Sequence, residues 1–223
     1  MHALLDAGLD LLLGGRCVGC GRPGQPLCRD CHTGLPDGSG TVERRVGRVP
    51  VVAAGAYDGV SRELVIGFKE RQEHALARPL AEQLALAVVV AIGSRRAPVV
   101  LVPVPSRPEA TRSRGLDSTA VLTARAARLL RRVDVDATVA RALRTRRGVR
   151  DQAGLDAAQR ARNLAGSMAA RTGRALRLSR ALVVVCDDVV TTGSTLAEAA
   201  RALSAAGVPP FACATIAATP RRN

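Results

Sequence analysis

Four short apolar runs, separated by segments with helical spacing of their apolar residues, constrain the fold most strongly. The runs cover residues 49–57, 98–105, 181–186 and 211–218. The helix-like segments cover residues 61–72, 75–92, 117–132 and 195–207. Strands that are apolar on both faces are typical of a parallel sheet covered by helices on both sides. The sequence therefore predicts an α/β fold with a mostly parallel sheet.

The chain has 223 residues, which is enough for one substantial core and a small appended module. A turn-rich stretch from about residue 32 to 48 is predicted to be a linker. It divides an N-terminal module, residues 1–47, from a larger domain, residues 48–223. Within that domain, residues 48–95 are expected to cap the sheet and residues 96–223 to form its ligand-binding core.

Four of the six cysteines form two C-x2-C pairs, Cys17 with Cys20 and Cys28 with Cys31. Two such pairs can place four thiolates around Zn²⁺, and four thiolates leave no open position for catalysis. The spacing predicts a small structural zinc ribbon that follows a short amphipathic helix. Two disulfides are the alternative, which a cytoplasmic setting disfavours. His32 is a weaker candidate ligand.

The formal charge of +14 favours polyanionic partners, such as phosphorylated metabolites or nucleic acid. However, 32 of the 33 basic residues are Arg, so a compositional bias of the source explains much of this charge. The longest apolar run, residues 84–92, is far shorter than the roughly 20 residues of a membrane span. A cytoplasmic protein without a membrane span is expected.

The stretch VVVCDDVVTTGSTL, residues 183–196, combines two adjacent acids with a turn rich in Thr, Ser and Gly. Residues 191–195 would present hydroxyls and backbone N–H groups at a helix N-terminus, where a phosphate binds favourably. The acids Asp187 and Asp188 would instead accept hydrogen bonds from hydroxyl groups. A ribose 5-phosphate group satisfies both demands. The alternative is that the acids cap a turn while Thr192 or Ser194 caps the helix.

This stretch resembles the 5-phosphoribosyl-1-pyrophosphate (PRPP) motif of type I phosphoribosyltransferases. Taken with the cysteine pairs, the whole chain resembles the competence-associated ComF/GntX family of phosphoribosyltransferase-like proteins. The matching segments, in order, are AYDG, FKE, VPVP, RSRG, QAGL, RARN and DDVVTTGST. The resemblance implies a phosphoribosyltransferase fold that binds PRPP with Mg²⁺ and displaces pyrophosphate with a nitrogen nucleophile.

The resemblance also implies individual roles. The acids would hold the ribose hydroxyls, the turn would hold the 5-phosphate, and the loop after residue 102 would face pyrophosphate and Mg²⁺. A mobile loop, residues 144–163, would close over the ligand. The implied PRPP-binding residues are Pro103, Val104, Pro105, Ser106, Asp187, Asp188, Val189, Thr191, Thr192, Gly193, Ser194 and Thr195. The implied catalytic residues are Asp187, Asp188, Arg107 and Arg150.

Several alternatives stay open at the level of sequence. The same ligand motif would serve a regulatory module that binds PRPP or a nucleotide without turnover. The basic segment RTRRGVR, residues 144–150, would allow sequence-independent binding of single-stranded DNA. The family has R-G-F-N-Q where residues 114–118 read RGLDS, so acceptor contacts at these positions are in question. Lys69 is predicted to lie on a solvated helix face, and both a monomer and a homodimer are compatible with the sequence.

Overall fold

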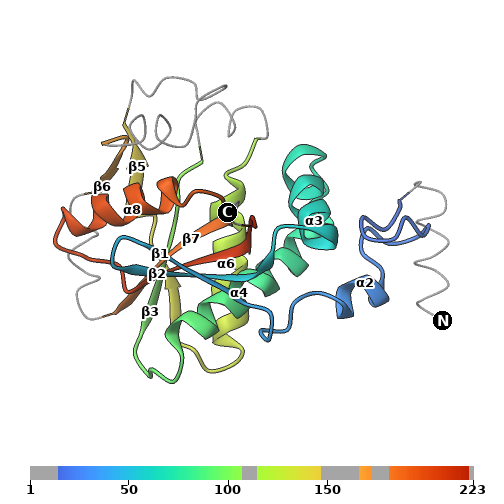
Figure 1. Cartoon of the computed structure of the whole chain (residues 1–223), viewed down its shortest axis with the longest axis horizontal. Coiled ribbons are helices and arrows are strands. Elements are labelled where there is room, and N and C mark those ends of the chain that lie inside the picture. Colours follow the sequence, from blue (N-terminus) through green and yellow to red (C-terminus); the bar gives the residue numbers. More distant parts are fainter. Residues whose placement is uncertain (1–14, 107–114, 147–165, 172–180, 221–223) are drawn as a thin grey trace.

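The computed structural model describes residues 15–106, 115–146, 166–171 and 181–220 (Figure 1). Its centre is a six-stranded sheet in the order β1-β2-β8-β7-β3-β4. The pair β1 and β2 is antiparallel, and every other neighbouring pair in this sheet is parallel. The expected α/β fold with a mostly parallel sheet is confirmed.

The elements follow the apolar segments closely. The strands of the main sheet are β1 (Val42–Val46), β2 (Val49–Ala56), β3 (Val99–Pro103), β4 (Ala137–Val139), β7 (Leu182–Val190) and β8 (Ala212–Ala218). A separate ribbon pairs β5 (Leu143–Thr145) with β6 (Met168–Ala170). The helices are α2 (Arg29–Thr33), α3 (Gly59–Glu70), the 3-10 turn η1 (His74–Leu76), α4 (Ala77–Ile92), α6 (Ser118–Arg131) and α8 (Ser194–Ser204).

Helices cover both faces of the sheet, and strand β7 shows why. Alternate side chains point to opposite faces of a strand. Val184 and Cys186 join the core beneath α3, α4 and α6, whereas Val183 and Val185 pack on the other side with Leu196 and Leu203 of α8. Figure 1 shows α4 and α6 lying together, with α8 across the sheet from them. The apolar strands are therefore buried on both faces, as their composition requires.

Residues His74–Ile92, which include α4, are the one described segment with the length and hydropathy of a membrane span. About 61% of its most apolar window is buried inside the protein. The helix packs against β2, β8 and α6. These contacts explain why α4 is so apolar: it is a helix of the protein core.

The predicted linker at residues 32–48 is wrong over its second half. Residues 42–46 form β1, which pairs in register with β2, for example Val42 with Ala53. Moreover, β2 pairs in parallel with β8 inside the main sheet, and α4 packs directly on both strands. These elements are therefore part of the sheet and its covering layer, and do not form a separate cap over it.

A further difference concerns the length of β7. The strand expected to end at residue 186 continues to Val190, so the two acids lie within β7 and not after it. Two short strands that the apolar runs did not indicate, β4 and β5, follow α6. The described residues 168–170 form β6, which pairs with β5.

The order of the parallel strands reverses between β3 and β7. From β3 the chain runs through α6 to β4 on one side, and later returns through β7 and α8 to β8 on the other. In open parallel sheets, ligands bind beyond the carboxyl ends of the strands at such a reversal. The topology therefore directs attention to the ends of β3 and β7.

Candidate functional site

The acid pair lies at this reversal, where β3 has ended and β7 continues. Pro103, the last residue of β3, stands opposite Cys186 of β7. The N–H of Val104 then donates to the carbonyl of Cys186 at 2.9 Å. Beyond this point β7 pairs with β8 only, up to Val190 opposite Ala218. The structure thus brings the predicted loop after β3 next to Asp187 and Asp188.

The two acids have different surroundings. Asp187 is half-buried and its Oδ1 accepts the N–H of Asp188 at 2.9 Å. Asp188 is buried, and its Oδ1 accepts the N–H of Val189 at 2.7 Å. The other oxygen of Asp188 forms an ion pair with the ammonium of Lys69, from the last turn of α3. The prediction that Lys69 lies on a solvated face is therefore wrong.

Burial raises the pKa of Asp187 to about 6. The positive charge of Lys69 acts in the opposite direction, and the negative charge of Asp117 adds to the increase. A carboxyl group with such a pKa near neutrality is typical of functional sites.

This pKa makes stability depend on Asp187 in a defined way. The folded protein holds a proton on Asp187 that the unfolded chain has already lost, so the free energy of unfolding falls as pH rises from about 4 to about 6. We expect Asp187→Asn to raise that free energy by about 1–3 kcal/mol at pH 7.5 and to have little effect at pH 4. Denaturant unfolding at both pH values measures the difference. Asp136→Asn, at an exposed acid, is the control; an equal gain at pH 4 would contradict the prediction.

The predicted phosphate turn connects β7 to α8 as expected. Gly193, the N-cap of α8, has φ of 81°, in the left-handed region that favours glycine. The hydroxyls of Thr192 and Ser194 are 2.9 Å apart, and Thr192 Oγ1 accepts the N–H of Ser194 at 3.3 Å. These three residues line a pocket of about 410 Å³ together with Arg45 and Arg201. The turn therefore offers hydroxyl groups and a helix N-terminus to one hollow.

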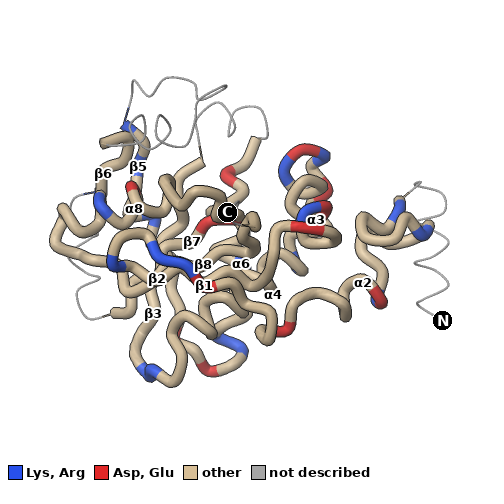
Figure 2. The backbone as a smooth tube through the Cα atoms, in the orientation of Figure 1, with Lys and Arg blue, Asp and Glu red and all other residues tan. Residues whose placement is uncertain are grey.

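Arg44 of β1 fixes the base of this turn. Its guanidinium donates to the carbonyl of Thr191 at 2.9 Å and also to the carbonyl of Thr219. Figure 2 shows a basic stretch on β1 beside the end of the main sheet. Sequence reasoning missed this contact because it placed residue 44 in a linker. The β1–β2 hairpin thus supports the turn from the side.

The loop after β3 is held by the start of α6. Ser106 Oγ donates to Asp117 Oδ1 at 2.8 Å, and the same oxygen accepts the N–H of Ala120 at 3.2 Å as the N-cap of α6. Asp117, one of three residues at positions 116–118 that differ from the R-G-F-N-Q pattern, thus orients the loop. The predicted catalytic residues Arg107 and Arg150 lie outside the described residues.

Three arginines that sequence reasoning did not single out lie beside this loop. Arg141, Arg144 and Arg171 line a pocket of about 270 Å³ together with Pro103 and Pro105. Arg144 and Arg171 come together because β5 pairs with β6, a contact between segments far apart in the chain. The basic segment at residues 144–150 gave a partial signal for Arg144 only.

The four N-terminal cysteines form a cluster. Their sulfur atoms all lie within 4.8 Å of one another, and the Cys20 and Cys28 sulfurs are 3.7 Å apart. Zn–S bonds of about 2.3 Å in a tetrahedron would place sulfurs about 3.8 Å apart. Burial raises the pKa of Cys17, but N–H groups donated by Cys28, Cys20 and Gly19 outweigh it and lower the pKa to about 6. The cluster could bind a metal such as zinc.

Cys186 and Cys213 are not part of this cluster, and the ring of His32 contacts Glu82. All six cysteines are free thiols, so the disulfide alternative is not realised. Cys186 and Cys213 are fully buried in β7 and β8, and burial raises the pKa of both. His32 Nε2 lies 2.8 Å from Glu82 Oε2 of α4, and this contact joins the cysteine module to the core.

No family model matches this chain, and no curated protein is similar to it in sequence. The interpretation of the site therefore rests on its own chemistry. Its components are two acids at the strand reversal, a turn rich in hydroxyls at the N-terminus of α8, and a pocket bordered by arginines. Together they could hold a ligand that carries both hydroxyl groups and phosphates.

Proposed function

We propose that this chain is a phosphoribosyltransferase-like protein of the ComF/GntX type, and that it binds PRPP or ribose 5-phosphate. The observation that carries the proposal is the placing of Asp187 and Asp188 just before the turn at the strand reversal. A sugar diol bound to the acids would point its 5-phosphate at residues 191–195. Its anomeric carbon would face the loop at Pro103 and Pro105, where a pyrophosphate would leave.

The surroundings of that loop suit a pyrophosphate. Arg141, Arg144 and Arg171 would contact its oxygens, because arginine binds phosphate with a planar pair of donors. Mg²⁺ accepts carboxylate and hydroxyl oxygens together with substrate phosphates, and Asp117 and Ser106 provide such oxygens here. With this ion bound, part of the charge of the departing pyrophosphate would be neutralised.

Under this proposal a nitrogen nucleophile displaces pyrophosphate from the anomeric carbon. The transition state is oxocarbenium-like, so the protein contributes orientation of the sugar and stabilisation of the leaving charge. The acids hold the ring by its hydroxyls and the arginines stabilise the phosphates. No protein nucleophile is required. Structural zinc at Cys17, Cys20, Cys28 and Cys31 completes the proposal and keeps the N-terminal module folded.

A binding module without turnover is the main alternative. It shares every contact proposed above except the acceptor site, so ligand binding alone does not separate the two. Release of pyrophosphate from PRPP and Mg²⁺, tested across a panel of nucleobases and simple amines, does. Release with one acceptor supports the enzyme, and binding without release across the panel supports the module.

Single-stranded DNA is a further proposed partner, because the same arginines would contact its phosphates. The chain has only three aromatic residues, of which Phe68 is buried, and so lacks a platform for stacking bases. Such binding would be independent of sequence and sensitive to salt.

Ligand binding is the direct test of the acid pair. We expect ribose 5-phosphate to raise the melting temperature, and PRPP with Mg²⁺ to raise it more, since a ligand bound only by the folded state stabilises it. Asp187→Asn combined with Asp188→Asn should remove most of this response, because charge-assisted hydrogen bonds contribute about 1.5–3 kcal/mol each. Thermal unfolding with and without ligand measures it. A folded double variant that binds as tightly as the parent would overturn the proposal.

A further inference from the structure

Lys69 is the only lysine in a chain with 33 basic residues, and it reaches the acid pair. Its ammonium contacts Asp188 Oδ2, a carboxylate whose side chain is 9% exposed, while its own side chain is 27% exposed. Lys69 comes from α3, whereas Asp187 and Asp188 come from β7, which is distant in sequence. A surface ion pair would be worth little, but this one lies at the candidate ligand site.

Helix α3 delivers this ammonium from a well-fixed position. Leu64, Val65 and Phe68 of α3 are buried in the core. Lys69 follows Val65 by four residues, so it lies on the same side of the helix. The helix therefore presents Lys69 toward β7, and Figure 2 shows that α3 carries charged residues of both signs.

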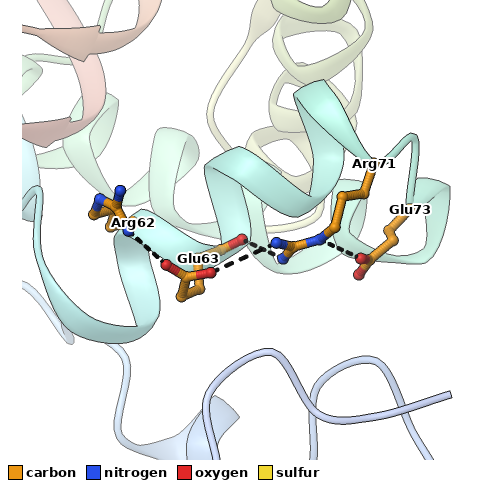
Figure 3. A network of polar contacts seen from close by, with 4 residues as sticks. All are labelled: Arg62, Glu63, Arg71 and Glu73. Atoms are coloured by element: carbon orange, nitrogen blue, oxygen red, sulfur yellow. Dashed lines mark hydrogen bonds and ion pairs between the residues drawn. The ribbon is translucent and has the colours of Figure 1, made fainter. Parts of the chain in front are cut away.

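A polar network fixes the C-terminal end of α3 (Figure 3). Arg71 Nε donates to Glu73 Oε1 at 2.7 Å, and another nitrogen of Arg71 donates to the carbonyl of Glu63 at 3.5 Å. Glu63 also accepts from Arg62 at 2.7 Å. The N–H of Glu73 donates back to the carbonyl of Gly67 at 3.1 Å. This end of the helix, with Lys69 on it, is thus held by several contacts.

The acid pair requires a positive charge for its proposed role. Asp187 is acted on by Lys69 from α3 and by Asp117 at the start of α6, and the thiols of Cys186 and Cys213 interact with its charge. Adjacent Asp188 adds a third carboxyl group. Neighbouring carboxyl groups in a buried place favour protonation, and a protonated acid accepts hydrogen bonds less well. Lys69 is the group in this set that opposes protonation.

We propose that Lys69 is a positioning residue of the phosphoribosyl site: its ammonium fixes the Asp188 carboxylate and keeps the acid pair ready to accept hydrogen bonds from the ligand's hydroxyl groups. This inference rests on the proposed function. A lysine suits the place because its ammonium is a compact charge on a flexible stem that reaches a buried carboxylate.

The test compares three single variants with the parent by calorimetric titration with ribose 5-phosphate between about pH 5 and 9. Lys69→Met removes the charge and keeps the length of the chain, and Lys69→Arg keeps the charge. Arg62→Met is the matched control, because it removes one exposed charge from the same helix, two turns before Lys69. Lys69→Gln replaces Lys69→Met if the latter fails to fold.

Parental affinity should fall as pH drops through about 6, where Asp187 becomes protonated. In Lys69→Met this midpoint should move to higher pH, and affinity at pH 7 should fall by about tenfold or more and largely recover at pH 9. Lys69→Arg should keep the parental midpoint, and Arg62→Met should match the parent throughout. A purely structural role would lower the melting temperature without moving the midpoint.

The outcomes separate this inference from the proposed function. A folded Lys69→Met protein with parental affinity and parental midpoint would overturn the role of Lys69 and leave the ligand site intact. A parent that binds neither ribose 5-phosphate nor PRPP would overturn the proposed function, and the role of Lys69 with it. Carboxyl NMR of the ligand-free proteins adds an independent readout: an Asp187 titration that does not move between the parent and Lys69→Met would contradict the inference.

Discussion

Replacing Cys17 with serine is expected to abolish the proposed zinc binding and to open residues 17–35, while the main sheet stays folded. Few described side chains of the module are buried: α2 contains no buried residue, and the buried apolar residues described before residue 42 are Cys17 and Leu35, with Val18 and Leu27 only partly buried against the core. Structural zinc contributes an apparent binding free energy of about 10–16 kcal/mol in small modules of this kind. Elemental analysis should find about one zinc per parent chain and almost none in Cys17→Ser.

Hydrogen exchange shows where the effect of Cys17→Ser is confined. Amides at residues 17–35 should lose protection, whereas amides of β7 and β8 should keep it. The control is Cys213→Ala, which removes a buried thiol from β8 far from the cluster. It should lower the melting temperature and retain the zinc. A Cys17→Ser protein with parental zinc content and parental protection would show that the cluster does not hold the module.

The parallel sheet could be predicted because its strands are buried on both faces. A fully apolar run such as residues 181–186 has few alternatives in a chain of this size. The helix faces were predictable for a similar reason: Leu64, Val65 and Phe68 share one side of α3 and are all buried. Both predictions depend on the spacing of apolar residues within one element, and this spacing can be read directly from the sequence.

Strand β1 was missed because an edge strand has a different pattern. Only its two ends, Val42 and Val46, are apolar, the three residues between them are charged, and no described strand pairs with its outer edge. Charged side chains are common on edge strands, where they discourage association with other sheets. The Gly and Ser residues just before it made the same stretch resemble a loop. Val42, Arg44 and Val46 share the half-buried face of the strand, and the charge of Arg44 hides this pattern in the sequence.

The end of β7 was placed too early for a related reason. The change from apolar residues to Asp187 and Asp188 marks the place where β3 ends, and β8 continues to pair with β7 up to Val190. A change from apolar to polar residues can therefore mark the end of a neighbouring strand and not the end of the strand itself. The contact of Lys69 with Asp188 was also missed, because Lys69 was predicted to lie on a solvated helix face. Its spacing of four residues from the buried Val65 was a signal against that prediction.

Replacing Gly193 with alanine is expected to lower the free energy of unfolding by about 2–5 kcal/mol and to weaken ribose 5-phosphate binding by more than about tenfold. Part of the loss comes from φ of 81°, which costs roughly 1–2 kcal/mol for a residue with a side chain. The rest comes from contact, because a Cβ here would lie 2.7 Å from Val46 Cγ1 of β1. Crowding of this kind typically costs about 1–3 kcal/mol.

Two variants separate these causes. Gly207 follows the same helix with φ of 79°, and a Cβ there would meet nothing within 4 Å, so Gly207→Ala should carry the backbone cost alone and leave ligand binding unchanged. Val46→Ala removes the atom that the new Cβ would meet. In the double variant Gly193→Ala with Val46→Ala, the combined loss of stability should be smaller than the sum of the single losses, because relief of the clash couples the two sites.

Denaturant unfolding and calorimetric titration measure both effects. If Gly193→Ala costs no more than Gly207→Ala and binds ribose 5-phosphate normally, the turn is not shaped by its contact with β1, and the 5-phosphate does not depend on the backbone at Gly193.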